Sequence, residues 1–184
     1  IILEILSTTF DSVGVFQELC KETCYAAQIF ETSTDKIEFT QEHLAIAVKK
    51  KFDDYSSRHN RCLESFVEQK AKSSDEVPLY IAYYFINVVL KSDFKTIMEG
   101  FKRRLLQDKI KEIHHRPDDV RPSDMGYFLQ NLIGSQSKKD ITPPIFDYDN
   151  STSTVKIIDS TFYFFVRNIN CIELLENLPK PTGI

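Results

Sequence analysis

The stretch SDMGYFLQNLIGSQSKKDITPPIFDYDNSTSTVKIID, residues 123–159, decides the expected fold because its hydrophobic period changes part-way along. Apolar residues recur at helical spacing in its first half, which predicts a helix over Ser123–Lys139 that begins with a serine cap. Beyond Pro144 they alternate with a period of two, which is typical of strands. The polar residues Asn150–Ser153 separate two such runs, so the second half predicts a β-hairpin over Ile145–Asp159.

The residues before this stretch predict a series of helices with short breaks. Leu79–Leu90 is apolar on nearly every side, so we expect a central, buried helix with Pro78 in its first turn. Asp93 suits the cap of a short helix, because its carboxylate can accept hydrogen bonds from the first turn. A further helix is expected over Arg103–His114, with or without a break near Gly100.

Three helices, a β-hairpin and a final helix, in that order, are typical of a winged helix-turn-helix domain. Ser123–Lys139 then takes the position of the recognition helix, and Ile145–Asp159 forms the wing. A last helix is expected from Ser160 and a short one over Ile172–Asn177, and the aromatic residues after Ser160 are expected in a core rather than on a partner surface. The expected core residues of the winged helix are Phe128, Leu132, Ile157 and Phe165.

The first part of the chain predicts a separate helical region. One helix is expected over Ser12–Ile29, and a longer one begins after the cap residue Thr40 and ends near Glu68, with Ser56-Ser57 as a candidate break. The polar run Ala71–Val77 is the candidate linker. We therefore expect a mainly α chain of two parts, a helical lid-like or linker domain over residues 1–76 and a winged-helix domain over residues 77–184.

Composition and charge exclude several classes of protein. The chain has 184 residues, of which 42% are hydrophobic and 27% charged, as in ordinary globular proteins. Its longest apolar run, near Leu79–Leu90, is well short of the ~20 residues that a membrane span needs, so we expect a cytoplasmic protein without a membrane partner. The net charge of −4 argues against bulk nucleic-acid binding. Lys91–Arg116 nevertheless carries eight basic and four acidic residues, which indicates either a nucleic-acid contact or a solvated helix face.

The start of the chain, the cysteines and a histidine pair add further expectations. No basic region precedes the apolar residues Ile1–Leu3, so no signal peptide is expected, and the abrupt apolar start is that of a segment cut from a longer protein or of a trimmed N-terminus. Cys20 and Cys24 share a helix face, but no further soft ligands follow at close spacing, so we expect packed free thiols and no metal site. His114 and His115 are expected to interact with a helix end rather than to bind a metal.

Two short stretches resemble parts of known ATPases. SVGVFQELC (Ser12–Cys20) resembles the helical lid that follows the P-loop core in AAA-type and STAND-type ATPases, and VKIIDSTFYFFVR (Val155–Arg167) resembles the end of the winged-helix domain that closes many prokaryotic ATPases of that kind. The resemblance implies a non-catalytic regulatory or interaction module, with a missing ATPase domain as its partner in cis and a protein as a further partner. The chain has no G-x-x-x-x-G-K-S/T motif, so ATP is implied only for the missing domain. No cofactor is expected in this chain, and the chain alone is not expected to be an enzyme.

The winged-helix interpretation leaves two kinds of partner open, and a DNA-binding module is the alternative to the ATPase interaction module. Arg58 and Arg61 lie three residues apart and would share a helix face, where they are candidates for an interdomain or phosphate contact; a plain solvated face is the alternative. The candidate nucleic-acid or partner contacts are Lys102, Arg103, Arg104, Lys109, Gln130, Asn131, Lys138, Lys139 and Lys156, and Gln136 is a further candidate reader of bases.

Overall fold

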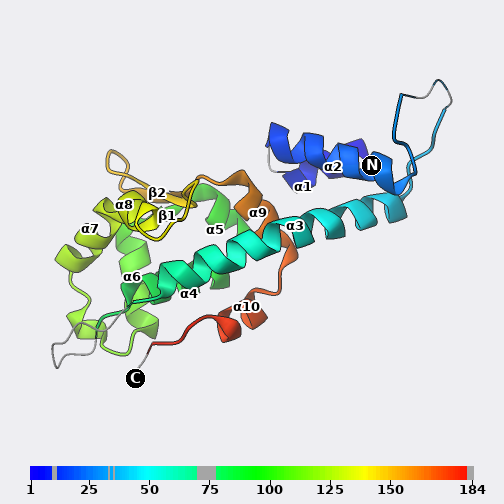
Figure 1. The fold of residues 1–184 in the computed structure, drawn as a ribbon. Coiled ribbons are helices and arrows are strands. Elements are labelled where there is room, and N and C mark those ends of the chain that lie inside the picture. Colours follow the sequence, from blue (N-terminus) through cyan, green and yellow to red (C-terminus); the bar gives the residue numbers. More distant parts are fainter. Residues whose placement is uncertain (10–11, 33, 35, 70–77, 182–184) are drawn as a thin grey trace. The chain divides into compact units, whose positions relative to one another are not determined.

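The chain divides into two compact units, and Figure 1 shows the elements of both. The computed structural model describes residues 1–9, 12–32, 34, 36–69 and 78–181. The units are named here the helical unit, which comprises Ile1–His59 and Ser160–Asn168, and the sheet unit, which comprises the described residues of Asn60–Asp159 and Ile169–Ile184.

These bounds differ from the expected domains of residues 1–76 and 77–184. The division falls inside a long helix, between His59 and Asn60, and a late segment of the chain returns to the helical unit. The candidate linker Ala71–Val77 lies outside the described residues. None of the helices in the described part of the chain is both long enough and apolar enough to cross a membrane.

Helices α2 and α3 of the helical unit begin after capping residues, and their apolar residues recur at helical spacing in the sequence. The Ser12 hydroxyl caps α2, because it accepts a hydrogen bond from the amide of Val15, and Thr40 caps α3 in the same way, as expected. The expected break at Ser56 is absent, since that hydroxyl donates to the carbonyl of Phe52 within one continuous helix. The helices of this unit are α1 (Ile2–Thr9), α2 (Val13–Ala26), the first part of α3 (Gln41–Val67) and α9 (Ser160–Asn168).

Aromatic side chains of α9 form much of the core of the helical unit. Phe164 is fully buried in an apolar cluster with residues of α1, α2 and α3. Phe165 is also fully buried, and its ring centroid lies 6.0 Å from that of Phe52 and 5.1 Å from that of His59. The predicted burial of these aromatic residues is confirmed. The expectation that Phe165 belongs to the core of the winged helix is wrong, because α9 packs on α3 within the helical unit.

The sheet unit alternates short helices with short strands. Asp93 caps α5 as expected, because its carboxylate accepts a hydrogen bond from the amide of Thr96. In chain order the elements are α4 (Ile81–Lys91), α5 (Phe94–Glu99), β1 (Phe101–Lys102), α6 (Arg103–Ile113), the 3₁₀ turn η1 (Pro117–Asp119), α7 (Pro122–Gln130), α8 (Leu132–Ser137), β2 (Phe146–Asp149), β3 (Thr154–Ile157) and α10 (Cys171–Asn177), together with the last part of α3.

Helix α4 lies at the centre of the sheet unit. Every residue from Tyr84 to Leu90 is buried, which confirms the expectation for a segment that is apolar on nearly every side. The helix begins at Ile81, after a residue in the left-handed conformation, so Pro78 precedes α4 instead of standing in its first turn. The rings packed around Phe85 are those of Phe66, Phe128 and Phe146.

The strands of the described residues form one antiparallel sheet with the order β1-β3-β2. The predicted hairpin is confirmed, with Phe146 opposite Ile157 and Asp149 opposite Thr154. Strand β1 was not expected, and it pairs with β3. Gly100 permits this pairing because its φ is +86° and because a Cβ atom at that position would lie 2.6 Å from the carbonyl oxygen of Val155.

The single helix expected over Ser123–Lys139 is two helices, α7 and α8. Asn131 interrupts it, with a backbone near the bridge region at φ −96° and ψ 9°. The start of α7 also differs from the expected start at Ser123, since Pro122 occupies the first turn and the Asp124 carboxylate accepts a hydrogen bond from the amide of Arg121. The expected serine cap is therefore inside the helix.

Candidate functional site

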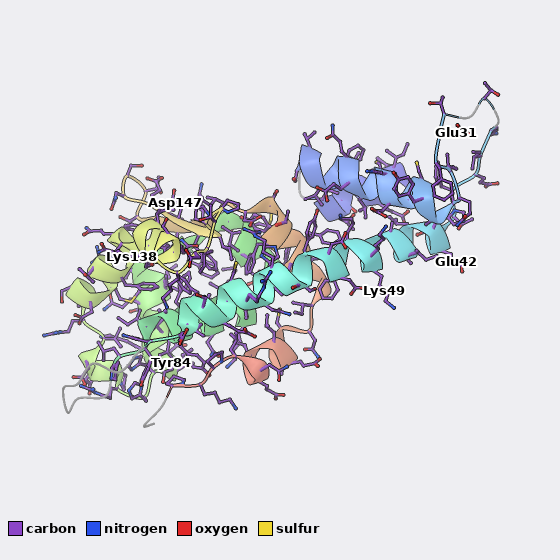
Figure 2. The ribbon with its side chains drawn as sticks, in the orientation of Figure 1. Glu31, Glu42, Lys49, Tyr84, Lys138 and Asp147 are labelled. Atoms are coloured by element: carbon purple, nitrogen blue, oxygen red, sulfur yellow. The ribbon has the colours of Figure 1, made fainter. Side chains whose placement is uncertain are left out.

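The outer side of α7 and α8 presents polar and aromatic groups to solvent. Tyr127 is 74% exposed, and Gln130 and Asn131 are exposed three and four residues after it; Lys138, at the end of α8, is also exposed. We call these four residues the α7–α8 face; Lys138 is labelled in Figure 2. Asn131 also donates from its side-chain amide to the carbonyl of Tyr127, at 2.8 Å. Gln130, Asn131 and Lys138 are thus accessible, and their contact with a nucleic acid or a partner stays a prediction.

The basic residues at the start of α6 are tied to their neighbours. The Lys102 ammonium donates to the carbonyl of Thr152 in the hairpin turn, at 3.0 Å. The Arg103 guanidinium donates to the carbonyl of Pro122 at the start of α7, at 2.7 Å. Arg104 is exposed on the next position of the helix. Two of the three cations thus brace the junction between α6, α7 and the hairpin.

Lys139 is a helix cap rather than a surface contact. Its ammonium donates to the carbonyls of Ser65 at 2.7 Å and Phe66 at 3.0 Å, and also to the carbonyl of Glu68. These groups lie at the C-terminal end of α3, where the last carbonyls have no partner inside the helix and favour a cation. Burial lowers the pKa of Lys139. The prediction that Lys139 reaches a nucleic acid is therefore corrected.

Gln136 is fully buried, so it cannot read bases. Its side-chain oxygen accepts from the amides of Ile145, at 2.8 Å, and Phe146, at 3.0 Å. Its nitrogen donates to the carbonyls of Phe146, at 2.7 Å, and Leu132, at 3.1 Å. The primary amide thus pairs with both backbone groups of Phe146, as an adjoining strand would, and it fixes α8 to β2.

The acidic residue of the hairpin turn is satisfied internally. One carboxylate oxygen of Asp149 accepts from the amide and hydroxyl of Ser151, and the other accepts from the hydroxyl of Thr152. The hydroxyls of these two residues hold the pKa of Asp149 well below its usual range. Lys156 of β3 is exposed. The wing-like hairpin therefore carries a structural acid and one accessible cation.

The remaining predicted contacts lie on different parts of the chain. Lys109 is exposed on α6. Arg58 is partly buried in the helical unit, where its guanidinium lies 3.4 Å from the hydroxyl of Thr161. Arg61 is exposed and falls in the sheet unit. The two arginines are thus assigned to different units, and their role in a phosphate contact stays a prediction.

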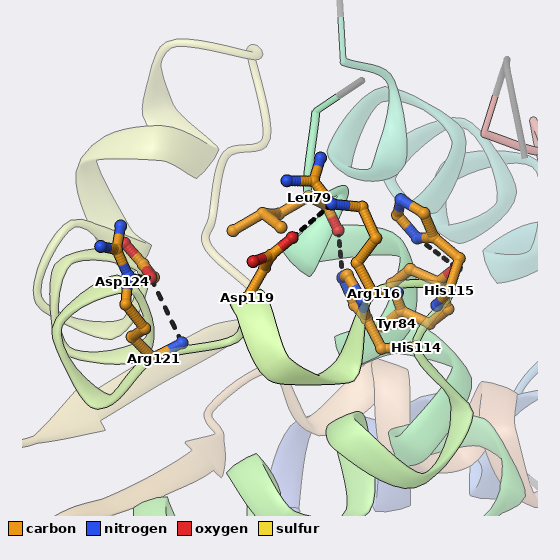
Figure 3. Close-up of polar contacts among 8 residues, drawn as sticks. All are labelled: Leu79, Tyr84, His114, His115, Arg116, Asp119, Arg121 and Asp124. Atoms are coloured by element: carbon orange, nitrogen blue, oxygen red, sulfur yellow. Dashed lines mark hydrogen bonds and ion pairs between the residues drawn. The ribbon is translucent and has the colours of Figure 1, made fainter. Parts of the chain in front are cut away.

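His114 and His115 form a polar cluster with α4, drawn in Figure 3. His114 is the residue that follows α6, and its backbone amide donates to the carbonyl of Lys111; an interaction of its imidazole with the helix end stays a prediction. The amide of His115 donates to the Tyr84 hydroxyl at 3.3 Å, and that hydroxyl lies 3.0 Å from Nδ1 of the same histidine. Beside the cluster, Arg116 is paired with Asp119.

No group of His, Cys, Asp and Glu side chains in the described ranges is arranged to hold a metal ion. The four cysteines are free thiols of intermediate exposure. No protein-family model, curated protein or solved structure matches the chain. The α7–α8 face and the cations around it are therefore the candidate functional site.

Proposed function

We propose that the chain is a non-catalytic interaction module of a larger prokaryotic P-loop ATPase, and that its sheet unit is a winged helix that docks a protein. The observation that carries the proposal is the sheet order β1-β3-β2, with α6, α7 and α8 between β1 and the hairpin. A winged helix has this order, with its helix-turn-helix between the first strand and the wing.

The character of the α7–α8 face favours a protein partner. Tyr127 is a large aromatic side chain with 74% of its surface exposed, and aromatic residues are enriched at protein interfaces. Cations that a DNA backbone would need are engaged elsewhere, since Lys139 caps α3 and Arg103 holds the start of α7. The face offers hydrogen-bonding amides and an aromatic ring, with a single lysine.

The ATPase part of the proposal rests on the resemblance of Ser12–Cys20 and Val155–Arg167 to the lid and the closing domain of such enzymes. The first stretch begins with the cap of α2, and the second runs from β3 of the sheet unit into α9 of the helical unit, so only Val155–Asp159 lie in the proposed winged helix. The chain would then act at the side of a nucleotide site supplied by another domain. A P-loop motif upstream in the same reading frame is the result that supports this part, and a reading frame without one contradicts it.

Docking through Tyr127 can be tested with one introduced tryptophan, because residues 1–184 contain none, and its emission is read as the difference between the variant and the same protein with Tyr127. In a Tyr127→Trp variant the new indole is expected to emit as a solvated group in the isolated chain. In the full-length protein its emission is expected to shift to shorter wavelength and become resistant to iodide, because docking removes water from the ring. A matched Ile172→Trp variant on exposed α10 should emit alike in both proteins. Equal emission from position 127 in both proteins contradicts docking within the full-length chain.

DNA binding is the second candidate, and it is favoured by four of the predicted contacts of the sheet unit that are exposed and have no role assigned above: Arg104, Lys109, Lys138 and Lys156. They allow no more than about four phosphate contacts, so a log–log salt slope of about −3 to −4 is expected if DNA is bound. The test is a gel shift with random-sequence duplex in low salt. If the sheet unit docks a protein, as proposed above, the chain should not retain the duplex.

Tight, salt-sensitive retention of the duplex would favour DNA binding over protein docking. A double charge reversal, Arg104→Glu together with Lys138→Glu, should then abolish the retention. Lys139 is not a suitable partner for this reversal, because a glutamate there removes the cap of α3 and changes the fold as well as the charge. Gln107→Glu is also unsuitable, since Gln107 is buried and donates to the carbonyl of Val120. Ser137→Glu on exposed α8 adds one negative charge without removing a cation, and it serves as the control.

A further inference from the structure

The start of α4 is held by the ring of His114, as Figure 3 shows. Its Nε2 lies 2.6 Å from the carbonyl oxygen of Leu79, two residues before the helix begins. Its Nδ1 accepts a hydrogen bond of 2.9 Å from the amide of Arg116. The ring therefore connects the segment that leads into α4 with the loop that follows α6.

These two partners fix the protonation state of the ring. A carbonyl oxygen only accepts, so Nε2 must carry a hydrogen; a backbone amide only donates, so Nδ1 of His114 must be bare. The neutral Nε2–H tautomer is the one form that satisfies both bonds. A second proton on Nδ1 would face the Arg116 N–H donor at 2.9 Å, and one of the two would have to move.

The held segment contains a strained residue. Tyr80 is buried and has φ +49° and ψ +37°, a left-handed conformation that is unfavourable for a bulky side chain. Its own carbonyl accepts the amides of Tyr83 and Tyr84, which form the first turn of α4. The hydrogen bond from His114 to the carbonyl of the preceding residue, Leu79, therefore stabilises the left-handed conformation of Tyr80, which is unfavourable on its own.

The surroundings of the ring disfavour a cation. Burial lowers the pKa of His114; the hydrogen bond to the Leu79 carbonyl opposes this effect, and the nearby charges of Arg116 and Asp119 act in opposite directions. Tyr84 of α4 packs against the ring with centroids 4.3 Å apart, and the ring of His115 stacks on it at 4.5 Å. The pKa of His115 is also lowered, first by burial and then by His114, so neither ring accepts a proton easily while the cluster is closed.

We propose that His114 is a pH-sensitive clasp, which holds the entry to α4 while its ring is neutral and releases it when the ring is doubly protonated. The proton enters at Nδ1 and displaces the Arg116 amide. The resulting imidazolium lies beside the Arg116 guanidinium in a partly buried site, and the two positive charges repel each other. The ring therefore rotates into solvent, and its hydrogen bond to the Leu79 carbonyl is broken. Tyr80 then relaxes from its left-handed conformation, and the first turn of α4 opens.

The sign of the pH dependence follows from the two states. The open state has the ordinary histidine pKa of about 6.5, and the closed state has a lower one. The clasp is therefore fully formed above pH ~6.5 and is lost as the pH falls from there through the pKa of the closed state. Between the two values, the equilibrium constant for opening should rise about tenfold for each pH unit.

The test is amide hydrogen exchange of the whole chain between pH 7.5 and 5, corrected for intrinsic rates. The amides of Tyr83 and Tyr84 report the first turn of α4, and those of Val89 and Leu90 in its buried last turn report global unfolding. The first pair is expected to exchange with a smaller opening free energy than the second pair, and to lose protection with the slope given above. Equal opening free energies at both ends of α4, or no pH dependence at the first turn, overturn the proposal.

Two variants and one titration complete the test. His114→Gln offers a neutral N–H to Leu79 and a carbonyl oxygen to the Arg116 amide, so it should keep the first turn closed and flatten its pH dependence. His43→Gln, at the start of α3, should leave that dependence unchanged. An unchanged slope in His114→Gln overturns the clasp. If that variant does not fold, the NMR titration of the native His114 ring decides, because a pKa at or above 6.5 contradicts a closed neutral ring.

Discussion

A Gln136→Leu chain is expected to lose about 3–5 kcal/mol of stability in the sheet unit, because the substitution leaves buried backbone groups without partners. Leucine matches the volume of the side chain but offers no acceptor to the amides of Ile145 and Phe146 and no donor to the Phe146 carbonyl. Each unpaired buried group costs about 1–3 kcal/mol. The expected loss is a large share of the stability of an ordinary domain.

Urea denaturation followed by circular dichroism gives the total change, and hydrogen exchange at the amides of Ile145 and Phe146 locates it. Gln130→Leu is the matched control, since it makes the same chemical change on the exposed side of α7 and should alter stability by less than about 0.5 kcal/mol. A Gln136→Leu chain that unfolds at the same urea concentration as the control would show that Gln136 does not hold β2.

Phe165→Ala is expected to cost about 3–5 kcal/mol in the helical unit. The side chain is fully buried and packs on Phe52 and His59, so its removal loses both transfer free energy and packing. The measurement is thermal and urea unfolding, with hydrogen exchange in α3 to assign the change to this unit. Val13→Ala, an exposed apolar residue of α2, is the control and should be nearly neutral. A native melting temperature for Phe165→Ala would mean that the aromatic face of α9 is not packed.

Local signals in the sequence were sufficient to predict most of the individual helices and the β-hairpin. The caps Ser12, Thr40 and Asp93 mark the starts of α2, α3 and α5, and their side chains make the bonds that a cap requires. The change from helical to alternating period gives the hairpin, since one face of each strand is buried. The break at Asn131 has no such signal, because apolar residues continue at helical spacing on both sides of it.

The candidate site was harder to predict because exposure depends on contacts between distant segments. The candidate contacts Gln130 and Lys138 are exposed, whereas the candidates Gln136 and Lys139, which lie close to Lys138 in sequence, are buried or half-buried. Gln136 is four residues from Leu132 and so shares the inner face of α8, which is a signal that was present. Nothing near Lys139 in the sequence indicates that the end of α3, about seventy residues earlier, supplies its acceptors.

The return of α9 to the helical unit has a consequence for synthesis on the ribosome. Helices α1 to α3 emerge first, but Phe162, Phe164 and Phe165 are made only after the whole segment Asn60–Asp159. Arg58 and Thr161, which meet in the finished unit, are 103 residues apart in the chain. The nascent helices must therefore wait with their apolar surfaces uncovered while the sheet unit is translated. Contacts of such long range slow folding, so α1 and α2 belong to a unit that is completed late, although they are made before the sheet unit.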